Sequence, residues 1–315
     1  MINLLPRPTI RPGDRVEYRR LDEALTRFTA DIRPLPGITV PASRECLVGQ
    51  IIDSQRRRRY VTDYLASADI SASSLDPSSR AFDPLRGALL SVRAGDVDEA
   101  CWLVFLSVHF GHHRVFGWAL PAAFYGRLGT SPHWSWGEVC RDPDAVGRWL
   151  DSNQARMRGA GHRFGNHRKY ESLSSNGTGC AVATYVRTVE DAKSATSRPE
   201  DVGSASTDPF DDAFRALDSV YRFGRTARFD YLTMLEKTRI FPQLVPQRAY
   251  LAGATGPLRA ARLLIDGAGS PRSTTASLEL STQQVRNHLA VPNDVLEDAL
   301  CNWQKSPTAF LPFRG

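Results

Sequence analysis

The sequence predicts a mostly α-helical protein on the basis of three observations. Apolar residues recur at helical spacing in many separate segments, and alternating patterns typical of strands are almost absent. A glycine-containing turn at Gly253 also opens directly into an amphipathic segment. The length of 315 residues suits one large or two modest domains. We expect residues 1–34 to form an N-terminal arm and a first helix, and residues 35–315 to form a single helical domain.

Each expected helix follows from its apolar spacing and from the residues at its ends. The first ends before Pro34, because the residue preceding a proline disfavours helical backbone. Residues 98–110 are strongly apolar and indicate a buried helix, whereas residues 193–212 are rich in Ser, Thr, Asp and Gly and predict a flexible loop. The expected helices cover residues 21–32, 42–65, 84–93, 98–110, 122–128, 143–155, 211–221, 257–265 and 293–304, with one more beginning near residue 226.

Composition restricts the class of protein. The chain has 40 Lys and Arg against 34 Asp and Glu, and nearly all of its cations are arginine, which suits bidentate contacts to phosphate. Five scattered cysteines without a C-x-x-C pair indicate reduced thiols and argue against a zinc or iron–sulfur site. No apolar run is long enough to span a membrane, and the N-terminus lacks a signal-peptide core. We expect a cytoplasmic, monomeric protein with no metal, no cofactor and no membrane partner.

The segment YLAGATGPLRAARLLI, residues 250–265, is the most informative in the chain. Gly253 and Gly256 permit a tight turn, and a proline suits the first helical turn because its missing N–H is not needed there. Free N–H groups at such a helix start, followed by Arg259, form a typical site for an anionic oxygen. A helix-hairpin-helix element holds a DNA phosphate in this way. The alternative is an ordinary loop-to-helix junction.

Two further segments combine cations with amide or aromatic side chains. Gln50 and Asp53 precede an arginine run at residues 56–59, which is either a solvated helix face or a cleft with arginines along a phosphate backbone. Residues 164–170 (FGNHRKY) are either a basic helix start or a set of contacts to phosphate and base, with aromatic rings available for stacking.

Two other segments place a carboxylate among apolar residues. Asp230 follows Arg225 and Arg228 and lies among aromatic residues, so it either pairs with a neighbouring arginine or faces a cavity. Asp298 and Trp303 share a face of the expected last helix, in which capping and packing are the simpler explanation. The histidines at 109, 112 and 113 lack the glutamate of a H-E-x-x-H metal motif.

Five segments in order resemble the alpha-glutamyl/putrescinyl thymine pyrophosphorylase family, clade 3 type: LVGQIIDSQRRRRYV, RFGNHRKYESL, FGRTARFDYLTM, LAGATGPLRAARLL and VLEDALCNWQKSP. The resemblance runs from about residue 35 to the C-terminus. It implies membership of the helix-hairpin-helix DNA glycosylase superfamily, whose fold has two helical subdomains flanking a cleft. It also implies double-stranded phage DNA with modified bases as the partner.

The resemblance supports two activities. The first is a monofunctional DNA glycosylase, an enzyme that hydrolyses the N-glycosidic bond of a flipped, bulky hypermodified pyrimidine such as alpha-glucosyl-hydroxymethylcytosine. It would leave abasic sites in phage DNA and serve anti-phage defence. The alternative is a transferase that adds an amine to a 5-pyrophosphoryloxymethyl pyrimidine in DNA, for which arginine clusters would stabilise the leaving group.

The resemblance also suggests site residues. In the superfamily the catalytic aspartate lies roughly twenty residues after the hairpin, and the acid of this sequence nearest to that position is Glu279; Asp230 and Asp53 are the rival candidates. No lysine lies in the helix of the hairpin, so a Schiff-base lyase step is not expected. The expected base pocket consists of Gln50, Asn166, His167, Tyr170 and Trp303. The expected DNA-binding residues are Arg56, Arg168, Lys169, Arg225, Arg228, Gly253, Thr255, Gly256 and Arg259.

Overall fold

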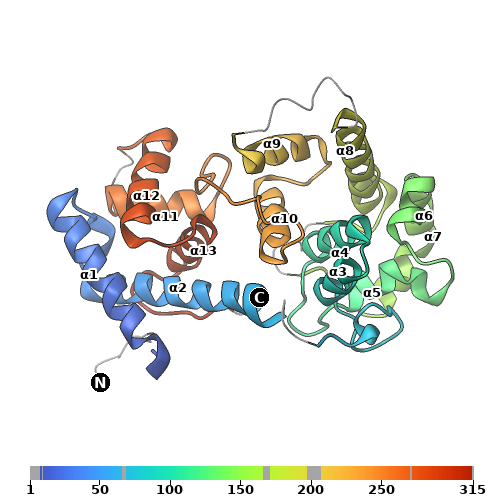
Figure 1. Ribbon diagram of the computed structural model, residues 1–315, viewed down its shortest axis with the longest axis horizontal. Coiled ribbons are helices and arrows are strands. Elements are labelled where there is room, and N and C mark those ends of the chain that lie inside the picture. The colour runs from blue at the N-terminus through green and yellow to red at the C-terminus, as the bar shows by residue number, and fades with distance from the viewer. Residues whose placement is uncertain are drawn as a thin grey trace. The chain divides into compact units, whose positions relative to one another are not determined.

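The protein is mostly helical in the part that its computed structural model describes, which is residue 8 and residues 10–65, 69–165, 171–196, 207–269 and 272–313 (Figure 1). These residues form thirteen α-helices and no strand, apart from one isolated bridge between His113 and Gly117. The mostly α prediction is confirmed. The chain divides into two compact units, one made of residues up to Val61 together with those from Pro246 on, the other of Thr62–Val245.

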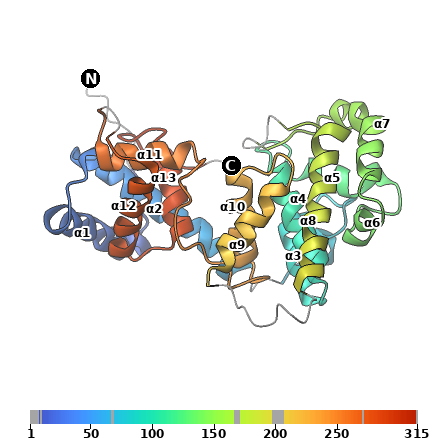
Figure 2. The same cartoon turned by 90° about the horizontal axis from the view of Figure 1, so that it is seen from above.

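The first unit, called the terminal unit below, joins both ends of the chain. Figures 1 and 2 show its last three helices gathered beside its first two, in agreement with the contacts between them. The helices are α1 (Arg15–Asp31), α2 (Pro41–Arg59), α11 (Gly256–Asp266), α12 (Thr275–Leu289) and α13 (Asn293–Trp303). The division expected at residue 34 therefore lies inside this unit, because the apolar face of α1 is buried against helices from the far end of the sequence.

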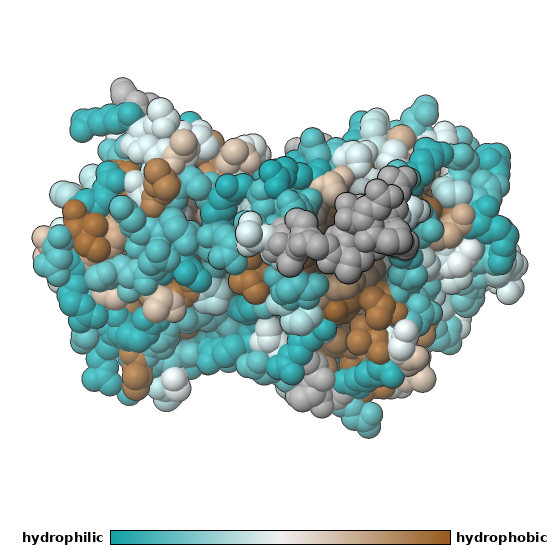
Figure 3. Space-filling view, turned by 45° about the horizontal axis from the view of Figure 1, so that its top comes forward, coloured by the Kyte–Doolittle hydropathy of each residue, from teal (hydrophilic) through white to brown (hydrophobic). Residues whose placement is uncertain are grey.

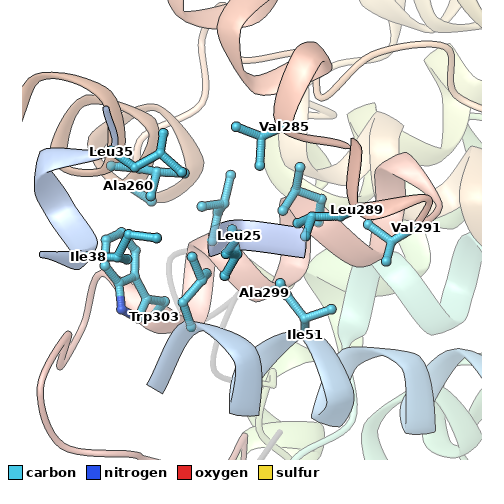
Figure 4. Close-up of a cluster of buried hydrophobic side chains, with 14 of the residues drawn as sticks. Leu25, Leu35, Ile38, Ile51, Ala260, Val285, Leu289, Val291, Ala299 and Trp303 are labelled. Carbon is cyan, nitrogen blue, oxygen red and sulfur yellow. The ribbon is translucent and has the colours of Figure 1, made fainter. Parts of the chain in front are cut away.

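One apolar cluster holds the terminal unit together (Figure 4). Leu25 of α1, Ile51 of α2, Ala260 of α11, Val285 of α12 and Trp303 of α13 all have at most 2% of their surface exposed. Burial of such side chains is the main favourable term in folding, at about 25 cal/mol per Å² of apolar surface. Residues 46–54 of α2 include eight buried positions, so this helix is enclosed on most of its circumference.

The second unit, called the central unit below, is built around α4. This helix has ten buried residues and packs against α3, α5, α6 and α10. Trp102 of α4 donates its indole N–H to the carbonyl of Trp134 at 2.7 Å and stacks on Tyr185. The helices are α3 (Pro84–Arg93), α4 (Val97–Phe110), α5 (Ala119–Tyr125), α6 (Trp136–Arg141), α7 (Ala145–Gly159), α8 (Cys180–Thr196), α9 (Pro209–Ala216) and α10 (Arg225–Lys237).

A buried carboxylate ties three elements of the central unit together. Glu99 of α4 accepts the hydroxyl of Tyr125 at 2.8 Å and the backbone N–H of Trp136 at 2.6 Å. Burial raises the pKa of the Glu99 carboxyl, and the two hydrogen bonds oppose this shift. Asp96 accepts the N–H of Glu99 at 3.0 Å and so caps the start of α4.

Several boundaries differ from those expected. The helix expected over residues 42–65 ends as α2 at Arg59 and continues as a π-helix, Tyr60–Leu65. The loop expected over residues 193–212 is shorter, because α8 reaches Thr196 and α9 begins at Pro209; residues 197–206 lie outside the described part. Three helices were not expected: α6, α8 and α12.

Where a helix-hairpin-helix element was expected, the described residues form a turn at Gly253 followed by α11. Residues 238–250, which lead into the turn, contain no helix, and the preceding helix α10 belongs to the central unit. Irregular backbone therefore precedes the glycine turn, and contacts other than helical hydrogen bonds must hold that backbone in place.

Candidate functional site

The turn before α11 has the geometry that its glycines predict. The N–H of Ala254 donates to the carbonyl of Leu251 at 3.0 Å, and Gly253 has φ +75°, a value that favours glycine. Helix α11 begins at Gly256 with a proline in its first turn. The first N–H groups of a helix have no intrahelical acceptor and carry the positive end of its dipole. The turn therefore presents donors suited to an anionic oxygen.

Gly256 serves packing as well as the turn. A Cβ atom placed on it would lie 2.9 Å from Sγ of Cys301 on α13, which is closer than real Cβ contacts. Thr255 precedes the helix and makes no capping bond with its side chain. Arg259 is exposed one turn into the helix, and no ion pair of its guanidinium is found among the described residues. Of the predicted DNA-binding residues, these lie together at one helix start.

Glu279 holds the backbone that enters this turn. Its Oε1 accepts the N–H of Ala249 at 2.8 Å and its Oε2 accepts the N–H of Leu251 at 2.6 Å. Tyr250, between them, has φ +51°, a left-handed conformation that costs energy for a residue with a side chain. Glu279, a predicted catalytic residue, thus uses both carboxylate oxygens to position the turn.

The arginine run on α2 is neutralised within the terminal unit. Arg56 donates to Asp14, with Nε 3.0 Å from Oδ2. Arg57 pairs with Asp53 and, through Nη2 at 2.7 Å, with Asp298. Two more pairs complete the set, Arg58–Asp294 and Arg59–Asp14. Arg56 is therefore paired with Asp14 and Asp53 with Arg57, so neither is an open charge on the helix surface.

Two residues expected in a base pocket are instead enclosed. Trp303 is 0% exposed and donates its indole N–H to the carbonyl of Ser43 at 3.1 Å. Gln50 is 2% exposed, and its Nε2 donates to the carbonyl of Leu311 at 2.8 Å. Both support the packing of the terminal unit. Five predicted residues lie outside the described part of the chain: Asn166, His167, Arg168, Lys169 and Tyr170.

The predicted residues on α10 are also held by neighbours. Arg225 is buried, with its guanidinium 4.5 Å from the centre of the Phe229 ring. Arg228 pairs with Asp218 at 2.8 Å and lies over the ring of Phe214. Asp230 is exposed on the same helix. Arg228 therefore has Asp218 as an ion-pair partner, whereas Asp230 was the aspartate expected beside the arginines of this helix.

A pocket of about 690 Å³ lies in the central unit, where the sequence analysis placed no site. Its walls combine aromatic rings with nitrogen-bearing side chains. The aromatic residues are Phe82, Phe116 and Trp118. The nitrogen-bearing residues are Arg80, His112, His133 and His162. The described residues that line it include no aspartate and no glutamate.

A small hairpin shapes one wall of the pocket. The N–H of Gly117 donates to the carbonyl of His113 at 2.7 Å, and the reverse bond is 3.0 Å long. Nδ1 of His113 accepts the N–H groups of Val115 and Phe116, each at 3.1 Å. His113 thus fixes the loop that presents Phe116 and Trp118. The signal for this wall in the sequence is the group of histidines and aromatic residues near 109–118, which lack a metal motif.

Large apolar side chains are exposed at scattered positions among the described residues. Hydrophilic residues predominate on the face shown in Figure 3, and apolar side chains gather in separate patches. Val115 and Phe116, beside the pocket, are 69% and 45% exposed. Across the residues that the structure describes, no helix combines the length and apolar character needed to cross a membrane, and no cluster of His, Cys, Asp and Glu has a metal-binding arrangement.

Comparison with known proteins gives one match. Searches of curated proteins and of solved structures find no significant similarity. The family model described as alpha-glutamyl/putrescinyl thymine pyrophosphorylase clade 3 matches residues 42–315, which include α2, the whole central unit and the hairpin with α11 to α13. Because the match covers most of the chain, the protein belongs to the alpha-glutamyl/putrescinyl thymine pyrophosphorylase family, clade 3.

Proposed function

We propose that this protein is a DNA-modifying transferase that displaces pyrophosphate from a 5-pyrophosphoryloxymethyl pyrimidine with an amine. The family description names pyrophosphorylases of glutamyl and putrescinyl thymine, which supports this chemistry over glycosidic cleavage. The observation that carries the choice is the engagement of Glu279, whose two carboxylate oxygens each accept a backbone N–H at 2.8 Å or less. A carboxylate used in this way is poorly suited to stabilise a sugar cation.

The proposed step is a substitution at carbon. The amine nitrogen attacks the exocyclic methylene carbon, and the bond from that carbon to the pyrophosphate oxygen breaks. Pyrophosphate leaves with the electron pair, and the amine nitrogen loses a proton to solvent or to a nearby base. Catalysis of such a step depends mainly on cations and N–H donors that stabilise the departing anion. No carboxylate need contact the sugar.

DNA is the proposed substrate, held by the turn before α11. N–H groups at the start of that helix and the exposed Arg259 would contact a backbone phosphate. Gly253 and Gly256 allow the close approach of backbone to phosphate, and Thr255 adds a hydroxyl that makes no capping bond. Contacts of this kind position DNA without reading its sequence.

The rival proposal is a monofunctional glycosylase that excises alpha-glucosyl-hydroxymethylcytosine or a similar base from phage DNA in defence of the cell. It requires a carboxylate beside the sugar. Three carboxylates are candidates for that role: Asp53, which is paired with Arg57, Glu279, which is bound to backbone N–H groups, and Asp230, which is exposed on α10. Release of free base is the property that separates this proposal from the transferase.

The test is to incubate the full-length protein with DNA containing 5-pyrophosphoryloxymethyluracil and either putrescine or glutamate. Mass spectrometry of the digested nucleosides should reveal an amine adduct, accompanied by release of pyrophosphate. Unmodified DNA is the control substrate, and DNA with glucosylated hydroxymethylcytosine is the parallel substrate. An adduct supports the transferase. Free modified base with alkali-labile strands, and no adduct, would replace it with the glycosylase.

A further inference from the structure

The pocket of the central unit is suited to a ligand larger than a single base. Its volume of about 690 Å³ falls in the range of small-molecule sites, about 300–1,000 Å³. The aromatic residues that line it offer flat surfaces for stacking, and the alanines on α5 leave space beside them. Planar rings bind such surfaces regardless of the identity of the base, because every base has a π-face.

The rings that line the pocket are held in place. His112 packs edge-on against Trp118, with 4.9 Å between the ring centres. Phe116 stacks on His113 at 5.0 Å and keeps 45% of its surface exposed. A pre-positioned aromatic ring with an open face is more useful to a ligand than to the fold, because its exposed surface contributes little to the apolar core.

The charged and polar groups at the pocket favour an anion. Arg80 lies within a tight turn in which the N–H of Phe82 donates to the carbonyl of Ser79 at 3.1 Å. No ion pair of Arg80 is found within the described residues. Nearby Asp76 uses Oδ1 to accept the N–H of Ser78 at 2.8 Å and does not line the pocket.

His162 supplies an unsatisfied nitrogen at the same pocket. Its Nδ1 is buried and has no hydrogen-bond partner in the structure. Burial, reinforced by the charge of Arg163, lowers the pKa of His162, so its imidazole is neutral near pH 7. A buried nitrogen without a partner costs free energy in the empty protein, and a ligand that supplies a donor or an acceptor removes that cost.

The opposite wall contains strained backbone. Arg127, Leu128 and Gly129 have φ values of +48°, +56° and +87° in succession, and the last two line the pocket. A left-handed conformation is unfavourable for arginine and leucine, and such conformations cluster at ligand sites. The turn therefore keeps an energetically costly shape at the place where a ligand would contact it.

We propose that this pocket binds a nucleobase joined to a pyrophosphate group. The base would stack against Phe116 and Trp118, and the pyrophosphate would be bound by Arg80 and the histidines. Two sources share this chemistry: a 5-pyrophosphoryloxymethyl pyrimidine in DNA and a free nucleoside diphosphate. The first source rests on the proposed function, whereas the second does not.

Isothermal titration of the full-length protein distinguishes these sources. One arm uses thymidine diphosphate, and the other uses a single-stranded oligonucleotide with one 5-pyrophosphoryloxymethyluracil, compared with the unmodified oligonucleotide. The variants are Arg80→Ala, Phe116→Ala and the conservative Phe116→Tyr. Arg187→Ala is the matched control, because Arg187 is an exposed arginine of the same unit, paired with Asp144, and does not line the pocket.

We expect Arg80→Ala and Phe116→Ala each to weaken binding about tenfold. Arg80→Ala removes a charge-assisted hydrogen bond, and Phe116→Ala removes a stacking surface. Phe116→Tyr and Arg187→Ala should bind within about twofold of the wild type, because stacking and the pocket charge are kept. Thermal unfolding of each variant verifies that it folds.

The outcomes separate the two proposals. Binding of the modified oligonucleotide that is weakened by Arg80→Ala and Phe116→Ala supports both the pocket assignment and the proposed transferase. Pocket-dependent binding of the diphosphate alone supports the pocket and counts against its role in the transferase. If the wild-type protein binds these probes in the pocket but does not modify DNA, the result counts against the proposed transferase and leaves the pocket assignment standing. Wild-type affinity in both alanine variants, or no binding of either probe, would overturn the assignment of the pocket.

Discussion

Oε2 of Glu279 on α12 accepts the N–H of Leu251 at 2.6 Å, so a side chain 28 residues downstream holds the first residue of the hairpin turn. The second oxygen accepts the N–H of Ala249 at 2.8 Å. Together these bonds fix Tyr250 in a left-handed conformation. The two N–H donors that lead into the turn are thus satisfied by one carboxylate.

Replacement of Glu279 by alanine should therefore weaken the fold and the hairpin together. We expect a loss of about 1–3 kcal/mol in the free energy of unfolding, because two backbone donors lose their acceptor. DNA affinity should fall with it. Urea denaturation and DNA binding by anisotropy provide the measurements. A catalytic role alone would leave both values at the wild-type level and remove only the chemical step.

Gly256→Ala should destabilise the packing of α11 against α13. The new Cβ would lie 2.9 Å from Sγ of Cys301, and overpacking of this kind costs about 1–3 kcal/mol. Cys301→Ala in the same chain removes the clashing sulfur, so the double variant should lose less stability than the sum of the two single changes. Additive losses in a double-mutant cycle would show that the contact is not the cause.

Arg259→Ala should weaken DNA binding to a similar extent for every sequence, because a phosphate contact carries no base information. The slope of log affinity against log salt should decrease in magnitude by about 0.9, the value for one lost phosphate contact. Arg27→Ala is the control, since Arg27 is exposed on α1 and its contact with Glu23 is 3.9 Å long. An unchanged slope in the Arg259 variant would remove this residue from the interface.

Asp14 should make stability depend on pH in the acid range. A hydrogen bond from Arg56 is the main cause of its lowered pKa, opposed by burial. Because the folded pKa lies below the unfolded value of about 3.9, the stabilisation is complete above that pH and is lost as the pH falls through the folded pKa. Asp14→Asn should cost about 1–3 kcal/mol at pH 7 and progressively less below about pH 4.

Denaturation of the wild type and the Asp14 variant from pH 2 to pH 8 measures this difference. Asp142→Asn is the matched control, because its pair with Arg148 is exposed and such pairs contribute at most about 1 kcal/mol. A difference between the wild type and Asp14→Asn that stays constant down to pH 2 would contradict the ion-pair explanation.

Local signals in the sequence predicted the strongest helices well. Residues 84–93 form α3 at the expected bounds, and α4 and α13 differ by a single residue at one end from their expected ranges. Each has a clear start signal or a dense apolar run. The missed α12 is polar on much of its surface, since its burial is limited to five residues that meet α1 and α11. A helix stabilised mainly by distant neighbours leaves a weak periodic pattern.

The candidate sites also divide into features set by local sequence and features set by distant residues. The sequence alone determined the helical class, the glycine turn at Gly253 and the family, because these depend on backbone conformation and on residues close together in the chain. Tertiary structure alone decided that Arg56 and Arg57 are paired with aspartates, that Trp303 is enclosed and that Glu279 holds the hairpin. It also assembled the pocket from four separate segments. Charge pairing and enclosure depend on partners tens or hundreds of residues away, which local spacing does not encode.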